Sequence, residues 1–137
     1  MMMKDKNNNM KKLIPILTVF LSFFLFPSTS LGEWTYVTKN IDGSKYFVDF
    51  DRIRERKGYV YYWTLGDLSK PTGQWFSVRT YNKGDCEQFR DKVITVTVFK
   101  GQMGEGESLT DNDEREWKYP PPDSSMEVVL KTVCNSI

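Results

Sequence analysis

The sequence predicts an α+β fold: a mainly antiparallel, curved β-sheet of about six strands, with one C-terminal α-helix packed on one face and tied by a disulfide. Three observations predict it. Short runs of β-branched and aromatic residues recur from residue 33 to about residue 100, separated by turn residues, which is typical of an antiparallel meander. Residues 124–135 have the spacing of an amphipathic helix. Both cysteines lie in the part of the chain that we expect to be exported.

The N-terminus has the pattern of a secretory signal peptide over residues 1–32. Residues 1–12 carry four lysines, residues 13–26 are almost wholly apolar, and small residues follow before the expected cleavage point at Glu33. The alternative is an uncleaved membrane anchor, although the apolar run is shorter than the roughly 20 residues that a spanning helix needs. We therefore expect export through the Sec pathway to the periplasm, the cell surface or the medium, with membrane contact only through the leader.

The expected mature protein, residues 33–137, has the length of a single domain. Removing a leader with four basic residues and one acidic residue from totals of 19 and 18 leaves 15 basic and 17 acidic residues. This balance produces no large electrostatic field for nucleic acid or for an anionic membrane surface. We therefore expect the partner to be another protein or a second copy of the chain, and not nucleic acid.

Alternating side chains and turn residues place the first strands. The most β-prone run, Tyr59–Leu65, is expected to be a central strand, with Tyr61 and Trp63 on one face and Tyr62 on the other. A loop is expected over residues 66–73 because glycine and proline punctuate them. The charged residues 51–57 are interpreted as a helical turn or a solvated connection. Two earlier strands are expected at Trp34–Thr38 and Lys45–Asp49.

The second half of the sheet is placed in the same way. The next strand is expected at Gln74–Tyr81, with a turn at residues 82–85. Cys86 is expected to begin a long strand that ends near Phe99. Residues 101–118 contain three glycines and a cluster of acids, which favours a mobile exposed loop.

The C-terminal helix carries several agreeing signals. Three consecutive prolines precede it and cannot lie in a helix interior. Ser124 followed by Glu127 is a capping-box pattern. The expected apolar face consists of Met126, Val129, Leu130 and Val133. A helix of about three turns is not stable alone, so it must dock on the sheet.

The two cysteines, Cys86 and Cys134, predict one disulfide, because an even number in an exported chain indicates pairing. The bridge would close a loop of about 49 residues. By lowering the entropy of the unfolded chain, it would contribute roughly 4 kcal/mol to the free energy of unfolding. The alternative is a pair of metal ligands, but the chain has no histidine and no CxxC motif. We expect no metal and no other cofactor.

The aromatic content suggests an interaction surface. Tyrosine, tryptophan and arginine are favoured where proteins meet. The alternative is that these side chains fill both faces of a thin sheet. If Tyr61 and Trp63 face away from the helix, a homodimer would cover them. The candidate partner-binding residues are Tyr61, Trp63, Trp75, Arg79 and Tyr81.

Enzymatic function has little support in the sequence. Without histidine, acid–base chemistry near neutral pH needs a perturbed acid or lysine. Asp49 and Asp51 would share a face if their strand continued, and paired carboxylates can do such chemistry. Acids at a strand end are more often solvated or capping groups. We therefore expect no catalytic residues and no enzyme.

Several short motifs occur together in a fixed order. They are an opening W-x-Y, then DGSKYFVDFDRI, GYVYYW, a strand leading into DC, a G-x-x-G-x-G loop, PPPDSS, and a closing helix with a cysteine near its end. This set resembles the bacterial surface-adhesin protein E family over nearly all of residues 33–137. The resemblance implies a six-stranded sheet with a C-terminal helix that a disulfide holds to its concave side.

The resemblance also implies a function. It suggests an outer-membrane adhesin that binds host extracellular-matrix and plasma proteins and can dimerise through its sheet. Its binding stretch corresponds to the strand before Cys86, where Arg79 and Tyr81 fit the pattern. We therefore expect an exported, non-enzymatic binding module of the cell envelope. The alternative is a structural or self-associating periplasmic protein with no external ligand.

Overall fold

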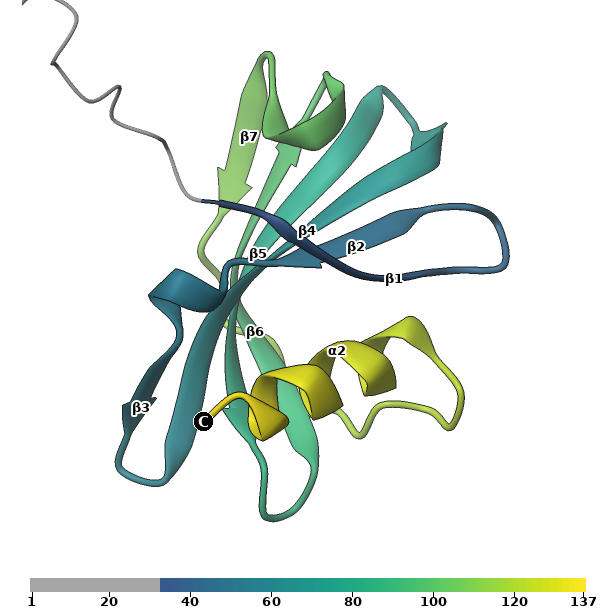
Figure 1. Ribbon diagram of the computed structural model, residues 1–137. Helices are drawn as coiled ribbons and strands as arrows, with labels where there is room; N and C mark the ends of the chain where they lie inside the picture. Colours follow the sequence, from purple (N-terminus) through teal and green to yellow (C-terminus); the bar gives the residue numbers. More distant parts are fainter. Residues whose placement is uncertain (1–32) are drawn as a thin grey trace, which may run out of the picture. The chain divides into compact units, whose positions relative to one another are not determined.

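In the computed structural model, which describes residues 33–137, one antiparallel sheet carries a C-terminal helix on one of its faces (Figure 1). The signal-peptide prediction concerns residues 1–32 and lies outside the described residues. Strands β1, β2, β4, β5, β6 and β7 are hydrogen-bonded in that order, and β3 pairs with β4. The predicted fold class is therefore confirmed. The strands are β1 (Thr35–Lys39), β2 (Lys45–Val48), β3 (Arg54–Arg56), β4 (Tyr59–Thr72), β5 (Trp75–Asp85), β6 (Arg90–Phe99) and β7 (Ser108–Asp111), and the α-helix is α2 (Ser125–Asn135).

Strand β4 is the longest strand of the sheet and is longer than predicted. It has 14 residues, so the expected loop over residues 66–73 is wrong. Gly66 lies opposite Val78 in the β4–β5 ladder. A Cβ on Gly66 would come within 3.2 Å of the Tyr46 ring. The glycine therefore makes room for a side chain packed across the strand, and does not mark a turn.

Strand β5 also continues beyond its predicted end, because residues 82–85 pair with their neighbours and do not turn. Gly84 lies opposite Val60, and a Cβ there would come within 2.8 Å of the Val60 side chain. The turn comes later, at residues 86–89, so the prediction that Cys86 begins a strand is wrong. Strand β6 has a bulge at Ile94, between the pairs Tyr81–Thr95 and Asn82–Val93.

The charged segment at residues 51–57 begins with the expected helical turn and then forms a short strand that was not predicted. A 3₁₀ turn, η2 (Phe50–Arg52), is followed by β3, which pairs with the first residues of β4. Lys57 and Gly58 both have positive φ, as a two-residue hairpin turn of type I′ requires. The charges remain exposed because β3 lies at the edge of the sheet.

The loop predicted for residues 101–118 is partly ordered into regular structure. It contains a 3₁₀ turn, η3 (Gln102–Gly104), and strand β7, which pairs with the end of β6. Ser77, which is fully buried, accepts a hydrogen bond from Gly104 N at 2.9 Å and donates one to Gly101 O at 2.7 Å. A buried serine of β5 thus holds the glycine-rich segment in place. The residue pattern within that segment does not reveal this contact.

Helix α2 buries its apolar side on the sheet, as predicted. Val129, Leu130 and Val133 are at most 2% exposed and pack with Val60 and Tyr62 of β4. The predicted cap is confirmed, because Ser124 Oγ accepts a hydrogen bond from Glu127 N at 3.1 Å. Met126 is an exception to the predicted apolar face, since it is 39% exposed, and Ser125 is buried in its place.

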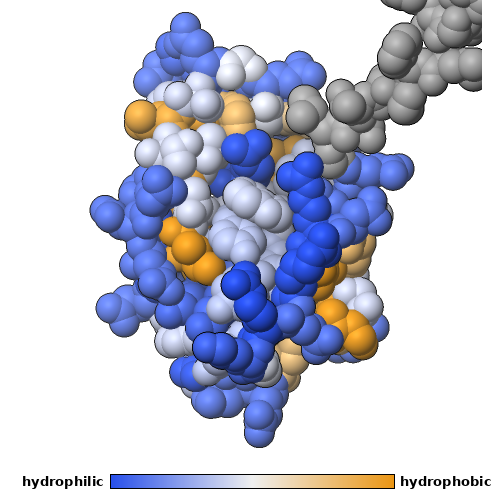
Figure 2. Space-filling view, turned by 90° about the vertical axis from the view of Figure 1, so that its left-hand side faces the viewer, coloured by the Kyte–Doolittle hydropathy of each residue, from blue (hydrophilic) through white to orange (hydrophobic). Residues whose placement is uncertain are grey.

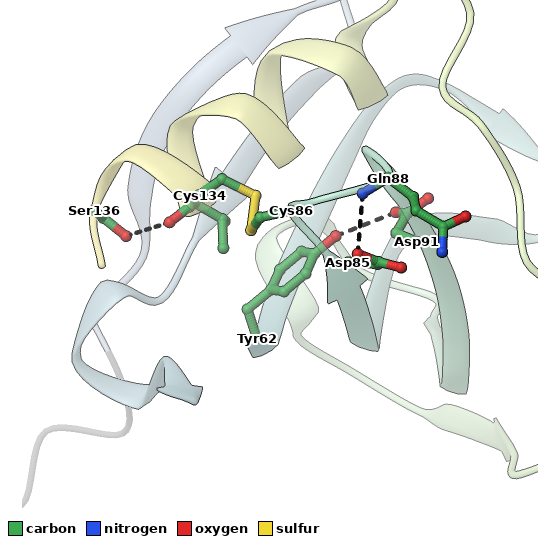
Figure 3. Close-up of a disulfide and its surroundings, with 8 residues drawn as sticks. Tyr62, Asp85, Cys86, Gln88, Asp91, Cys134 and Ser136 are labelled. Atoms are coloured by element: carbon green, nitrogen blue, oxygen red, sulfur yellow. Dashed lines mark hydrogen bonds between the residues drawn. A yellow bond between two sulfur atoms is a disulfide. The ribbon is translucent and has the colours of Figure 1, made fainter. Parts of the chain in front are cut away.

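The predicted disulfide is present and joins the helix to the sheet. Cys134 near the end of α2 is bonded to Cys86 in the turn after β5 (Figure 3). The two Cα atoms are 5.8 Å apart, and 48 positions separate the residues in the chain. Within residues 33–137, no helix is both long and apolar enough to span a membrane.

Candidate functional site

The two faces of the sheet differ because successive residues of a strand point to opposite sides. Val60 and Tyr62 of β4 lie in the core under α2. Tyr61 and Trp63 therefore point to the other side, which we call the open face. Both are half-buried, and α2, the α-helix of residues 33–137, packs on the opposite face.

A row of rings and guanidinium groups, which we call the ring stack, crosses the open face. The centroids of Trp63 and Tyr81 are 4.7 Å apart in a stacked arrangement, and those of Tyr61 and Tyr81 are 6.1 Å apart. Arg79 lies 5.5 Å from the centroid of Trp63. In spatial order the ring stack consists of Arg56, Tyr61, Tyr81, Trp63, Arg79 and Phe99.

The ring stack follows from the register of β4 and β5. Trp63 pairs with Tyr81 and Leu65 with Arg79, so side chains of the two strands alternate across the ladder. Arg56 reaches Tyr61 from β3, at 4.9 Å, and Phe99 reaches Arg79 from β6, at 5.2 Å. Cation–π contacts of this kind each contribute about 0.5–1 kcal/mol at exposed sites.

A second aromatic pair lies beside the ring stack. Tyr59 and Trp117 have centroids 5.8 Å apart, and Lys83 Nζ is 4.1 Å from the Tyr59 centroid. Trp117 is also contacted by Arg90 at 4.3 Å and by Lys92 at 5.0 Å. The segment that follows β7 therefore returns to the open face, where the bridge between Asp91 and Lys118 holds it.

The cations of the open face fall into two groups. Arg90 is paired with Asp85 at 3.1 Å, and Lys92 with Glu114 at 2.7 Å. The hydrogen bond from Lys92 lowers the pKa of Glu114. Three other cations, Arg56, Arg79 and Lys83, contact rings but form no ion pair within the described part of the chain. Figure 2, viewed from the side away from α2, shows pale side chains of intermediate hydropathy flanked by strongly hydrophilic ones.

Four of the five predicted partner-binding residues are brought together by the fold. Tyr61, Trp63, Arg79 and Tyr81 are consecutive members of the ring stack. Trp75 is separate, at the β4–β5 hairpin end, where it pairs with Thr72. It lies six positions before Tyr81 in the extended strand, which is about 20 Å.

The sequence prediction missed several members of this surface. Tyr59 shares a strand face with Tyr61, so alternation was a signal that could have included it. Lys83 lies in the stretch that the resemblance indicates for binding but was not among the five candidates, and it belongs to β5 because residues 82–85 pair and do not turn. For Trp117 the sequence left two positions open, a return to the sheet or packing beside the helix. The pairing between Asp91 and Lys118, which are distant in the chain, returns it to the sheet beside Tyr59.

The carboxylate pair considered for catalysis does not form. Strand β2 ends at Val48, so Asp49 and Asp51 do not share a strand face. Asp49 is buried and lies 3.3 Å from Arg52, whereas Asp51 is exposed on η2. Asp49 therefore lies just after the end of β2 and pairs with Arg52, which is a structural contact.

The turn that carries Cys86 is held by polar side chains (Figure 3). Asp85 accepts hydrogen bonds from Gln88 N and from Arg90 Nε, each at 3.1 Å. The Gln88 bond, with that of Arg90, lowers the pKa of Asp85. Tyr62 OH donates to Asp91 Oδ2 at 3.1 Å, and burial raises the pKa of both groups. These contacts fix the turn from which the disulfide reaches α2.

Comparisons with known proteins agree with this architecture. The sequence profile of the surface-adhesin protein E family matches residues 34–135. A crystal form of Haemophilus influenzae protein E is 17% identical, with a TM-score of 0.61 over 81% of this chain and 94% of that chain. Protein E from non-typeable Haemophilus influenzae is also 17% identical, with a TM-score of 0.57 over 81% of this chain and 82% of that one.

At this identity the solved structures show a shared fold. No curated protein sequence matches the chain closely. The family profile, in contrast, covers almost all of residues 33–137 and includes both cysteines of the bridge. The chain therefore belongs to the surface-adhesin protein E family.

Proposed function

We propose that this protein is an exported, non-enzymatic binding module whose open face contacts an extracellular protein. One observation carries the proposal: Tyr61, Trp63, Arg79 and Tyr81 form a continuous, half-exposed cluster on the face that the helix leaves open. These are the residue types that dominate binding energy at protein interfaces. Membership of a surface-adhesin family supports the proposal.

The disulfide supports the exported location. A bridge between Cys86 and Cys134 is stable in an oxidising compartment and is rare in the cytosol. The rigid placement of the aromatic and arginine side chains on the sheet also favours binding. Tyr61, Trp63, Arg79 and Tyr81 lie on the central strands β4 and β5, so their side chains lose little freedom when a partner docks.

The test is a binding screen with the exported protein against purified extracellular-matrix and plasma proteins, measured by surface plasmon resonance. Tyr61→Ala should weaken a positive interaction by about 2 kcal/mol, which is roughly thirtyfold in Kd. Tyr119→Ala is the matched control, because Tyr119 is a 63% exposed tyrosine outside the ring stack. Equal effects of the two substitutions would reject the open face as the binding surface.

Trp75 tests the extent of the surface. It lies about 20 Å from Tyr81 along β5. Trp75→Ala should therefore affect only a partner large enough to span that distance.

Self-association without an external ligand is the competing function. A second copy could cover the open face, because a two-fold dimer places the same patch of both subunits in contact. Sedimentation velocity over a concentration series, with and without the positive proteins of the screen, separates the two. A dimer that Tyr61→Ala dissolves, together with an empty screen, would replace the adhesin proposal by self-association.

A further inference from the structure

We infer that the open face recognises an extended acidic segment of its partner, with carboxylates bound by Arg79 and Lys83. The inference rests on the proposed function, since it names the chemistry of the protein that the open face contacts. Four observations carry it: the unpaired charge, the fixed position of Arg79, the filled faces of the rings and the spacing of the cations.

The first argument is the charge that is left unpaired. Arg90 and Lys92 already have carboxylate partners on this face. Arg79 and Lys83 form no ion pair with any residue from 33 to 137, although Lys83 lies near enough to Glu114 to help lower the pKa of that carboxyl. The Arg79 side chain makes no hydrogen bond in this range, and its Nε is buried without an acceptor. Because the buried Nε is out of reach of an outside ligand, a partner's carboxylate would bind the terminal N–H groups of this half-buried side chain.

The second argument is that Arg79 is held in place. Its guanidinium contacts the ring of Trp63 at 5.5 Å and that of Phe99 at 5.2 Å. A planar guanidinium stacked between rings can still donate from its edge and loses less freedom on binding than a mobile side chain. Lys83 is similarly placed, with Nζ 4.1 Å from the Tyr59 centroid.

The third argument concerns what the rings can offer. Tyr81 has Tyr61 on one side and Trp63 on the other, and Trp63 is also contacted by Arg79. The ring faces are therefore occupied by their neighbours. A single-stranded nucleic acid needs free faces on which its bases can stack, so this arrangement disfavours it. The groups that remain available are ring edges, tyrosine hydroxyls and cationic N–H groups, which suit a partner rich in acceptors.

The fourth argument is spacing. Arg79 and Lys83 lie on one face of β5, four residues apart, which is about 13 Å. In an extended peptide, side chains at positions i and i+4 also point to one side and are separated by about the same distance. An extended chain running along β5 can therefore place one carboxylate on each cation.

The experiment measures binding of fluorescent poly-L-glutamate to the full exported protein by anisotropy, with poly-L-glutamine as the neutral probe. We expect binding of poly-L-glutamate alone, weakening as salt rises. Arg79→Gln and Lys83→Gln should each reduce affinity about tenfold, because each removes a charge-assisted hydrogen bond. Lys100→Gln is the control, since Lys100 is an exposed lysine whose ammonium is already paired with Glu107, and it should leave affinity unchanged.

Arg79→Lys separates charge from geometry. It keeps the positive charge but loses the planar fork, so its affinity should lie between those of the wild type and Arg79→Gln. Each variant is compared with the wild type by circular dichroism and thermal unfolding. If Arg79→Gln does not fold, Lys83→Gln decides the question, because Lys83 carries half of the proposed contact.

Three outcomes would overturn the inference. They are no binding of poly-L-glutamate, an equal loss in Lys100→Gln, and stronger binding of heparin or an oligothymidylate that depends on Arg79 while poly-L-glutamate is ignored. The proposed function is judged separately. If a protein from the screen binds through Tyr61 and is unaffected by Arg79→Gln and Lys83→Gln, the open face is a binding surface whose partner is not acidic.

Discussion

Removal of the Cys86–Cys134 bridge should destabilise the protein more than most single substitutions in the core. The cysteines are 48 positions apart, so the bond closes a loop of about 49 residues. In the chain-entropy description, a loop of this length restricts the unfolded chain by about 4 kcal/mol. A domain of this size has a total stability of roughly 5–15 kcal/mol, so the reduced protein is near the limit of folding.

The assay is urea unfolding of the wild type with and without reductant, beside the variant Cys86→Ala/Cys134→Ala. With a slope of about 2 kcal/mol per molar urea, loss of the bridge should lower the midpoint by about 2 M. Thermal unfolding should shift by roughly 15–30 °C, since each kcal/mol changes the midpoint by about 4–8 °C in a small domain. The double variant should match the reduced wild type and should not respond to reductant.

A loss below about 1 kcal/mol would refute this reasoning. It would mean that burial alone holds α2 on the sheet or that the unfolded chain already keeps the two segments close. Leu130→Ala tests the first explanation, because it measures how much burial contributes to holding α2. Leu130 is fully buried, and its truncation should cost about 2–5 kcal/mol whatever the state of the cysteines.

Three further substitutions test local features of the fold. Gly84→Ala should destabilise by about 1–3 kcal/mol, because the new Cβ would lie 2.8 Å from the Val60 side chain; Val60→Ala should relieve much of that cost in a double-mutant cycle of urea midpoints. Ser124→Ala should cost about 1 kcal/mol of stability by thermal unfolding, through loss of the bond from Glu127 N. Asp85 has a lowered pKa in the folded state, so its contribution to stability is present above the unfolded pKa of about 3.9 and is lost as pH falls through the folded value. Asp85→Asn should therefore lower the urea midpoint at pH 7 and reduce its fall toward acid pH, and an unchanged pH profile would contradict the assignment.

Much of this protein could be predicted from local sequence. The cap at Ser124, the apolar positions Val129, Leu130 and Val133, and the alternation in Tyr59–Leu65 depend on neighbours within a few positions. The pairing of Cys86 with Cys134 followed from having only two cysteines in the part expected to be exported. Such signals act through backbone periodicity and composition, so they are readable without knowing the fold.

The lengths of the strands depended on information outside each segment. Gly66 and Gly84 look like turn residues in sequence, yet each lies in a strand because a side chain from a neighbouring element occupies the space above it. Strand β7 forms in a glycine-rich, acidic segment because β6 offers an unpaired edge and Ser77 anchors the preceding turn.

The sequence by itself determined the class of fold, the helix with its cap, the disulfide and the residue types available for binding. Only the tertiary structure decided that Tyr61, Trp63, Arg79 and Tyr81 form one stack while Trp75 stays apart. The physical reason is that the stack depends on the register between β4 and β5. A shift of one residue in that register would send every second side chain to the opposite face.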